Sequence, residues 1–294
     1  MGHFSRPLSI LFVTIFYQKA LSVKAIMKTF YFIVLLLLIG VYPTFSQTTA
    51  PADSMVYVCP PCNGSCDQLQ FDKPGVCPHC GMTLVKMSLS DFKKQLAAKP
   101  VTIAFYLQDG VEVLDFAGPL EVFTTAGFNV IIVSKTYKPI RSKTVLFITP
   151  DYTVADAPKS DILVVFGGPT QPTIDDPEVM AWLKAQISTD QYVMSVCTGA
   201  FILGKTGILD NLTATTFHTA IGDLAKAYPK TKVLANTRFV DNGNVITTAG
   251  ISAGIDGALH LVEKLRGRPY AQSVAETIEY DKWVPDNGLI VKTN

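Results

Sequence analysis

The chain has 294 residues, of which 48% are hydrophobic and 17% are charged, so it can bury one large core and carry a small module beside it. Its 25 Lys and Arg residues nearly balance 24 Asp and Glu residues, which leaves a formal charge of +1. A near-neutral chain without a long basic run is not expected to bind nucleic acid. Five of the six cysteines lie between Cys59 and Cys80, and Cys197 stands alone, which separates a cysteine-rich module from a larger domain.

The N-terminal region has the pattern of an export signal. Residues 29–45 form a 17-residue uncharged run that follows a short positive stretch and ends in small residues. This pattern predicts a signal peptide over residues 1–46, cleaved after Ser46, with Met27 as the true start. The alternative is a signal anchor that stays in place, because a run of this length is at the lower limit for spanning a membrane. We expect an exported, periplasmic protein with no membrane span after cleavage.

The segment after the signal predicts a small metal-binding module. Residues 47–56 are polar and read as a linker, and residues 57–87 contain two Cys-x-x-Cys pairs. Two such knuckles can deliver four sulfurs to one tetrahedral ion. Two disulfides with one cysteine left over are the alternative, which an exported setting permits. The predicted metal ligands are Cys59, Cys62, Cys77 and Cys80, with Cys66 and His79 as further candidates.

This module resembles the heavy-metal-binding domain found beside copper-transporting ATPases and metal-efflux proteins. The resemblance rests on the Tyr-x-Cys-Pro start at Tyr57 and on the run from Pro74 to Leu84, PGVCPHCGMTL. Where that family has Met-His after the first Cys-Pro, this chain has Pro61 and Cys62, so its predicted site is richer in thiolates. Thiolate ligands suit zinc or copper(I), and the sequence leaves the choice open.

Residues 88–100 are predicted to be a connecting helix or linker, and residues 101–294 a single large domain. Short apolar runs alternate there with helical stretches, which predicts a doubly wound α/β fold with a parallel sheet. Ligands of such folds bind at the carboxyl ends of the strands. The predicted strands are 101–107, 129–134, 162–166, 192–196 and 245–248. The predicted helices are 119–126, 177–187, 198–205, 219–228 and 253–265.

Cys197 is the main candidate for chemistry because it lies where a strand turns into a helix. The strand YVMSV precedes it and the small residues Thr-Gly-Ala follow it. The free N–H groups at the start of a helix favour an anion, so we expect a thiolate there, which is the reactive form. The alternative is a buried cysteine that packs as a small hydrophobic residue.

Five ordered motifs in residues 101–269 resemble the ThiJ/PfpI superfamily, and within it the isonitrile hydratase-like branch and the ligand domains of AraC-type regulators. The motifs are LDFAGPLEVF, FGGP, CTGAFILG, GILDNLTATTFH and TTAGISAGIDGALHLVE. This superfamily has the flavodoxin-like, class I glutamine amidotransferase-like fold, so the resemblance implies the same α/β architecture that the alternation of strands and helices predicts.

The resemblance also implies roles for individual residues. Cys197 matches the family nucleophile, Asp115 the acidic residue that contacts it, and Thr198 its neighbour. Gly167 and Gly168 match the backbone donors of the oxyanion site. His218, near the family histidine, is the candidate catalytic base. Phe217 separates it from the two preceding threonines, which relatives follow directly with the histidine. His260, on the last long helix, is expected to be structural.

Two classes of function follow. The first is a cysteine-dependent hydrolase or hydratase acting on a small carbon–nitrogen substrate, in which Asp115 holds or passes a proton and no cofactor is required. The second is a non-catalytic protein that binds a ligand or senses thiol or metal stress. In both cases we expect a small molecule as the partner, and a homodimer because relatives often form one.

Overall fold

The protein is described by a computed structural model that covers residues 54–60, 65–97, 100–143, 145–187 and 192–292. The predicted signal peptide and Cys62 lie outside these residues. All of the described residues belong to one unit, Asp53–Asn294. Among them, no helix combines the length and the apolar character that crossing a membrane requires.

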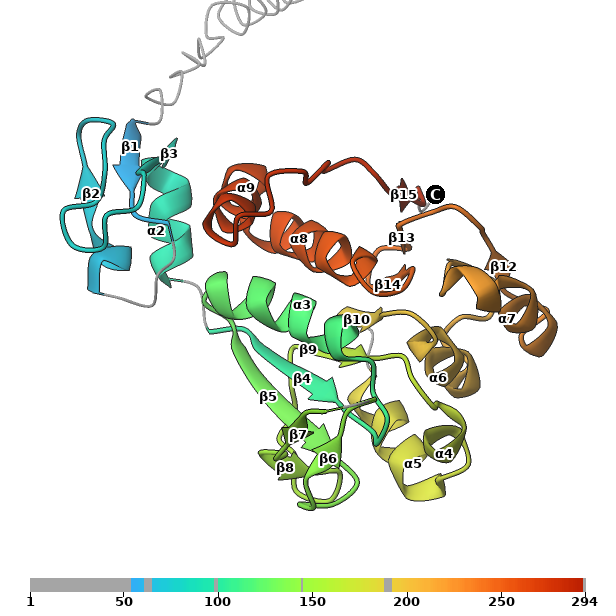
Figure 1. The fold of residues 1–294 in the computed structure, drawn as a ribbon. Helices are drawn as coiled ribbons and strands as arrows, with labels where there is room; N and C mark the ends of the chain where they lie inside the picture. The colour runs from blue at the N-terminus through green and yellow to red at the C-terminus, as the bar shows by residue number, and fades with distance from the viewer. Residues whose placement is uncertain (1–53, 61–64, 98–99, 144, 188–191, 293–294) are drawn as a thin grey trace, which may run out of the picture. The chain divides into compact units, whose positions relative to one another are not determined.

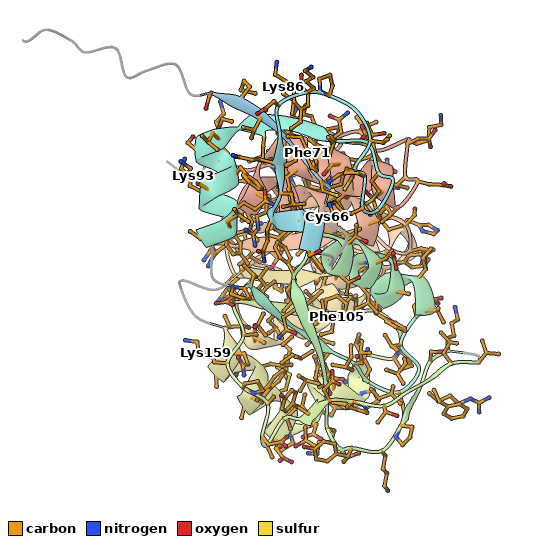
Figure 2. The ribbon with its side chains drawn as sticks, turned by 90° about the vertical axis from the view of Figure 1, so that its left-hand side faces the viewer. Cys66, Phe71, Lys86, Lys93, Phe105 and Lys159 are labelled. Carbon is orange, nitrogen blue, oxygen red and sulfur yellow. The ribbon has the colours of Figure 1, made fainter. Side chains whose placement is uncertain are left out.

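The cysteine-rich segment folds around a small antiparallel sheet with the strand order β2-β1-β3. Its elements are β1 (Met55–Val58), the 3-10 helix η1 (Ser65–Gln68), β2 (Gln70–Phe71), β3 (Val85–Ser88) and α2 (Leu89–Ala97). Strand β1 therefore begins inside the stretch that the sequence predicts as a linker. Cys66 lies on η1 and Phe71 on β2, whereas Phe105 belongs to the main domain (Figure 2).

The main domain is built on an eight-stranded sheet with the order β15-β13-β14-β10-β9-β4-β5-β8. All of its neighbouring strands are parallel except the antiparallel pair β13 and β14. The predicted doubly wound parallel sheet is thus confirmed apart from this one antiparallel pair, and the predicted strands agree to within one residue at either end. The strands are β4 (Thr102–Tyr106), β5 (Asn129–Ser134), β8 (Tyr152–Thr153), β9 (Ile162–Val165), β10 (Tyr192–Ser195), β13 (Phe239–Asp241), β14 (Val245–Thr248) and β15 (Leu289–Ile290).

Helices cover both faces of this sheet because its central strands are apolar on both sides. Along β4, Ile103 and Phe105 pack in one core cluster, and Ala104 and Tyr106 pack in the other. The first cluster contains residues of α3 (Val113–Thr125), α8 (Ala253–Arg266) and α9 (Arg268–Thr277), and α8 lies beside both other helices (Figure 1). The second contains residues of α5 (Pro177–Gln186) and α6 (Gly199–Thr206).

Shorter elements complete the domain. They are the hairpin of β6 (Ile140–Arg141) and β7 (Phe147–Ile148), α4 (Gln171–Ile174), β11 (Thr213–Ala214), η2 (His218–Ala220), α7 (Ile221–Ala227) and β12 (Lys232–Val233). Helix α3 starts earlier than the predicted helix 119–126 and carries Pro119 inside it. Asp115 therefore lies within the first turn of α3 and is not the N-cap residue, which is Glu112.

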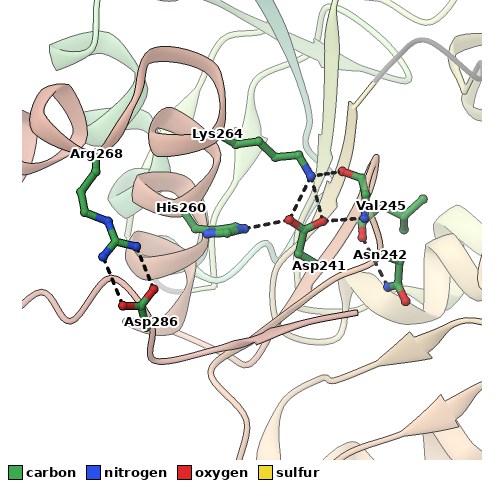
Figure 3. Close-up of polar contacts among 8 residues, drawn as sticks. Asp241, Asn242, Val245, His260, Lys264, Arg268 and Asp286 are labelled. Carbon is green, nitrogen blue, oxygen red and sulfur yellow. Dashed lines mark hydrogen bonds and ion pairs between the residues drawn. The ribbon is translucent and has the colours of Figure 1, made fainter. Parts of the chain in front are cut away.

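His260 is structural, as the sequence suggested. Its Nε2 lies 2.9 Å from Oδ2 of Asp241, and Nζ of Lys264 lies 2.9 Å from the same oxygen (Figure 3). The Asp241 side chain on β13 is almost fully buried, so these two partners on α8 hold β13 against the helix. Burial raises the pKa of Asp241, but its bonds to His260 and Lys264 outweigh that effect and lower the pKa below its ordinary value.

Candidate functional site

Cys197 lies on a strained turn between β10 and α6. Its φ angle is 59°, in the left-handed region that non-glycine residues rarely adopt. The turn is held by the backbone N–H of Cys197, which donates to Ala249, and by the hydroxyl of Thr216, which donates to the Cys197 carbonyl over 2.7 Å. A Cβ on Gly199 would lie 2.6 Å from the carbonyl oxygen of Val165, so this glycine lets α6 start directly against β9.

Asp115 faces the Cys197 thiol across Gly167. A Cβ on Gly167 would lie 2.6 Å from Oδ2 of Asp115 and 2.8 Å from Sγ of Cys197, so only glycine leaves room for both groups. Oδ1 of Asp115 accepts the backbone N–H of Ile251 over 2.7 Å. Oδ2 has no hydrogen-bond partner among the described residues, and the Asp115 side chain is fully buried. The structure therefore brings the predicted acid and the predicted nucleophile together.

Burial raises the pKa of both Cys197 and Asp115, which favours the neutral form of each group. Burial raises the pKa of the Cys197 thiol to about 12, the Asp115 charge adds to this rise, and the N–H of Thr198 opposes it. Burial likewise raises the pKa of Asp115 to about 6, against the hydrogen bond from Ile251. The expected resting thiolate is therefore wrong, because the start of a short helix does not outweigh desolvation and a neighbouring carboxylate. Protonation of Asp115 removes the part of this rise that its charge causes, and the larger part due to burial remains.

The two glycines of the predicted oxyanion site have different partners. The N–H of Gly168 donates to the hydroxyl of Thr198 over 3.1 Å, and that hydroxyl lies 3.2 Å from the Gly168 carbonyl. The N–H of Gly167 is near the Asp115 carboxyl group and lowers the pKa of that acid. The N–H of Thr198 is directed at Cys197. Of the three predicted donors, Thr198 is the one that already faces the sulfur.

A cavity of about 460 Å³ opens on Cys197. Phe217 lines it and His218 does not, since the His218 ring is exposed on η2 and packs against Phe217 with centroids 4.3 Å apart. Ile251, which has a φ of 58°, also lines the cavity. The cavity is lined by Gly110, Glu112, Lys143, Gly168, Pro169, Cys197, Thr198, Phe217 and Ile251.

Sequence reasoning missed three contributors to this cavity. Ile251 holds Asp115 through its backbone N–H, and the only sequence signal for it is its place in the AGIS segment after β14. The Nζ of Lys143 donates to Glu112 over 2.9 Å at the cavity wall, a pairing between residues 31 positions apart that no local pattern reveals. Phe217 could have been found, because it stands directly after the two threonines.

A second cluster of chemical groups lies in the cysteine-rich module. Cys59, Cys66, Cys77 and Cys80 place their sulfur atoms within 4.8 Å of one another, and the sulfurs of Cys59 and Cys80 are 3.1 Å apart. Cys80 is exposed and the other three are buried. Three of the four predicted ligands thus meet, and Cys66 joins them. The remaining predicted ligand, Cys62, lies outside the described residues, and His79 is exposed.

The comparison with known protein families decides the classification. Residues 101–264 match the DJ-1/PfpI family, and residues 56–87 match the heavy metal binding domain. The chain belongs to the DJ-1/PfpI family. The match to the second family agrees with the predicted module over residues 57–87.

Relatives of this DJ-1/PfpI domain include an isonitrile hydratase from Pseudomonas putida, which is 37% identical over 180 residues that make up 60% of this chain and 78% of the relative. The Parkinson disease protein 7 homolog of Danio rerio is 30% identical over 174 residues, 57% of this chain and 91% of the relative. A crystal structure of a ThiJ/PfpI family protein from Pseudomonas syringae superposes with a TM-score of 0.58 at 31% identity, covering 64% of this chain and 78% of that one.

The cysteine cluster of the heavy-metal module fits a metal ion. Four sulfurs this close together match the ligand number of a tetrahedral thiolate site, in which metal–sulfur distances are about 2.3 Å for zinc. Burial raises the pKa of Cys77, but the backbone N–H groups of Cys80 and His79 oppose it and bring the pKa down to about 7. The turn that follows is held by the N–H of Gly81, which donates to Cys77 over 2.9 Å. The knuckle therefore presents one sulfur that is easily deprotonated.

Proposed function

We propose that the DJ-1/PfpI domain adds water to a small carbon–nitrogen substrate, and that the substrate is an isonitrile. The observation that carries this proposal is the position of Oδ2 of Asp115, which is buried and faces the Cys197 sulfur across Gly167. A carboxyl group with a pKa near 6 can hold a proton at this place and release it at neutral pH. The similarity to an isonitrile hydratase supports the same reaction.

In the proposed reaction, Cys197 is the nucleophile and Asp115 transfers the proton. The Cys197 thiol passes its proton to the Asp115 carboxylate as the sulfur attacks the terminal carbon of the isonitrile, and Asp115 then passes this proton to that carbon, which gives an S-linked thioimidate. Water then adds to the same carbon, the carbon–sulfur bond breaks, and the nitrogen takes a proton. The sum is one isonitrile plus one water, which gives one N-substituted formamide, with no change of oxidation state in the protein.

The surroundings of Cys197 favour this addition over the hydrolysis of an amide. Amide hydrolysis with a cysteine nucleophile generally uses a base that takes the thiol proton and later donates to the leaving nitrogen. No histidine is among the described residues that line the cavity. Phe217 lines the cavity beside Cys197 instead. An isonitrile needs a proton at its carbon, which Asp115 supplies, and has no amine to expel.

The test is to incubate the protein with benzyl isonitrile and to follow N-benzylformamide by NMR. We expect formamide to form with the wild type and not with Cys197→Ser. The matched control is Thr277→Ser, a conservative hydroxyl change on α9, which should leave the rate unchanged. If the wild type binds the isonitrile but forms no formamide above the buffer rate, the domain is instead a ligand-binding or thiol-sensing protein.

We also propose that the heavy-metal module binds one zinc or copper(I) ion through Cys59, Cys66, Cys77 and Cys80. Zinc and copper(I) are the ions that thiolate-rich sites prefer. Metal analysis after purification with and without each ion would distinguish them, with one ion per chain expected. Two disulfides in place of the ion, found by mass spectrometry of protein purified without reductant, would refute this assignment.

Export and dimerisation are further proposals. Export to the periplasm predicts a mature N-terminus at Gln47, which N-terminal sequencing of the protein from a periplasmic fraction would detect. A homodimer predicts a sedimentation mass of twice that of the mature chain. A monomer over the whole concentration range would refute the second proposal without affecting the first.

A further inference from the structure

The AGIS segment between β14 and α8, residues 249–252, contacts both reactive groups of the site. The carbonyl of Ala249 accepts the backbone N–H of Cys197 over 3.1 Å. The backbone N–H of Ile251 donates to Oδ1 of Asp115 over 2.7 Å. Both contacts use main-chain groups of the segment, so they depend on its backbone conformation and not on its side chains.

Ile251 has a backbone conformation that its surroundings must enforce. Its φ angle is 58°, in the left-handed region. A β-branched residue is an outlier there, because its Cβ crowds the backbone. Such a conformation costs free energy and persists only where the rest of the structure holds it. The contact between Ile251 and Asp115 therefore needs support from outside the AGIS segment.

Arg238, directly before β13, contacts both ends of the AGIS segment. Its carbonyl accepts the N–H of Ala249 over 2.9 Å, and its Nη2 donates to Oγ of Ser252 over 3.2 Å. Its Nε donates to Asp256 on α8, which also accepts the hydroxyl of Tyr280 over 3.2 Å. The Asp256 side chain is only 5% exposed, so this charge-assisted bond fixes the orientation of the guanidinium group.

The hydroxyl of Ser252 serves this contact instead of the helix that follows. Ser252 is the N-cap residue of α8, a position at which a serine hydroxyl usually accepts an N–H of the first turn. The Ser252 side chain makes no such bond, and its oxygen accepts from Arg238. The hydroxyl therefore ties the AGIS segment to Arg238 and does not cap α8.

We propose that Arg238 is a positioning residue, which holds the AGIS segment at Ser252 so that the Ile251 N–H stays on Asp115. Burial raises the pKa of Asp115, and the bond from Ile251 is the largest of the effects that lower it. Loss of the support from Arg238 should therefore raise this pKa further. The catalytic meaning of the role rests on the proposed hydration, in which Asp115 transfers the proton, but the contact itself does not.

The other charged and titratable groups around Asp115 are left unchanged by the test. Glu112 and the thiol of Cys197 act on Asp115 directly. Lys143 also senses it, since the pKa of Lys143 is raised by its bond to Glu112 and, more weakly, by the Asp115 charge. On the side of α8, the Asp256 carboxylate is paired with Arg238. Arg238→Lys keeps that positive charge and Ser252 carries none, so both variants act on position and not on charge.

The test is a pH titration of the Asp115 carboxyl group by ¹³C NMR in the full-length protein, with its signal assigned through Asp115→Asn. Ser252→Ala should raise the pKa of Asp115 from about 6 to about 6.5, the size expected when one hydrogen bond is weakened. Arg238→Lys should do the same, because a single ammonium nitrogen cannot reach Ser252 while it is paired with Asp256. No isonitrile is used, so a failure of the proposed hydration would leave this result intact.

Three comparisons separate the positioning role from a general loss of stability. Ser252→Thr keeps the hydroxyl and should keep the wild-type pKa of Asp115. Arg238→Lys combined with Ser252→Ala should raise this pKa no further than either change alone, since both break the same link. The control is Ser273→Ala, which removes a buried hydroxyl that donates to Tyr270 within α9 and should leave the pKa unchanged.

Three results would overturn the proposal: an unchanged pKa of Asp115 in Ser252→Ala, an equal rise in Ser252→Thr, or additive rises in the double variant. If Arg238→Lys does not fold, the two Ser252 variants still decide.

Discussion

Replacing Asp115 by Asn separates the two roles assigned to this acid. The amide has the shape of the carboxyl group, keeps an oxygen for the Ile251 N–H, and carries no charge. It also places N–H donors where Oδ2 faces the sulfur, as a permanently protonated acid would. It cannot transfer that proton to a substrate carbon. We therefore expect Asp115→Asn to make Cys197 more reactive toward a simple electrophile and less active in turnover.

The size of the effect follows from the pKa of Cys197, which rises from an ordinary 9.0 to about 12, with burial as the largest cause and the Asp115 charge next. If removal of that charge restores about one pKa unit, the thiolate fraction at pH 7 increases about tenfold. Iodoacetamide labelling, quantified at the Cys197 peptide by mass spectrometry, should accelerate by the same factor. Asp223→Asn, an exposed acid on α7, is the control and should leave the rate unchanged. An unchanged or slower rate in Asp115→Asn would refute the proposed coupling.

The same variant has a stability signature with a defined sign. The pKa of Asp115 is about 6 in the folded protein and near 3.8 when unperturbed, so its ionisation opposes folding. The destabilisation is absent below the lower pKa, grows between the two values, and is complete above pH 6, where it reaches about 3 kcal/mol. Urea unfolding should therefore find Asp115→Asn more stable than the wild type at pH 8 and equal to it below pH 4. A stability difference that does not depend on pH would contradict the raised pKa.

Three further predictions test other parts of the structure. Gly199→Ala should lower the free energy of unfolding by about 2 kcal/mol in a urea titration, because its Cβ would lie 2.6 Å from a carbonyl oxygen of β9. The control is Gly222→Ala on α7, whose Cβ would have no neighbour within 4 Å. This control should raise the free energy of unfolding by about 0.5 kcal/mol. Asp241→Asn should cost about 3 kcal/mol at pH 7 by leaving the buried His260 and the partly exposed Lys264 without their carboxylate. Since the pKa of Asp241 is depressed, this loss should shrink as the pH falls below that pKa, and a constant loss would contradict it. Cys66→Ser should weaken the cobalt–thiolate absorbance of the metal-loaded module, and an unchanged spectrum would remove Cys66 from the ligand set.

The sheet and the position of Cys197 could be predicted from sequence because both depend on local patterns. Apolar runs such as residues 162–166 are buried on both faces, and that pattern is typical of a central parallel strand. The short strands β8, β13 and β15 were not predicted, since two or three residues carry no periodicity. The start of α3 was misplaced because Pro119 suggested a first helical turn, and the structure has it inside the helix.

The sequence by itself determined the family, the strand-to-helix turn at Cys197 and the presence of a cysteine-rich module, because each depends on a pattern of residues close together in the chain. The protonation state of the site was decided by the tertiary structure alone. Burial and the approach of Asp115, which lies 82 positions before Cys197, raise the pKa of the thiol, and no local pattern contains either effect. The packing of distant segments also decides that Phe217, and not His218, lines the cavity. It likewise places Cys66 in the sulfur cluster.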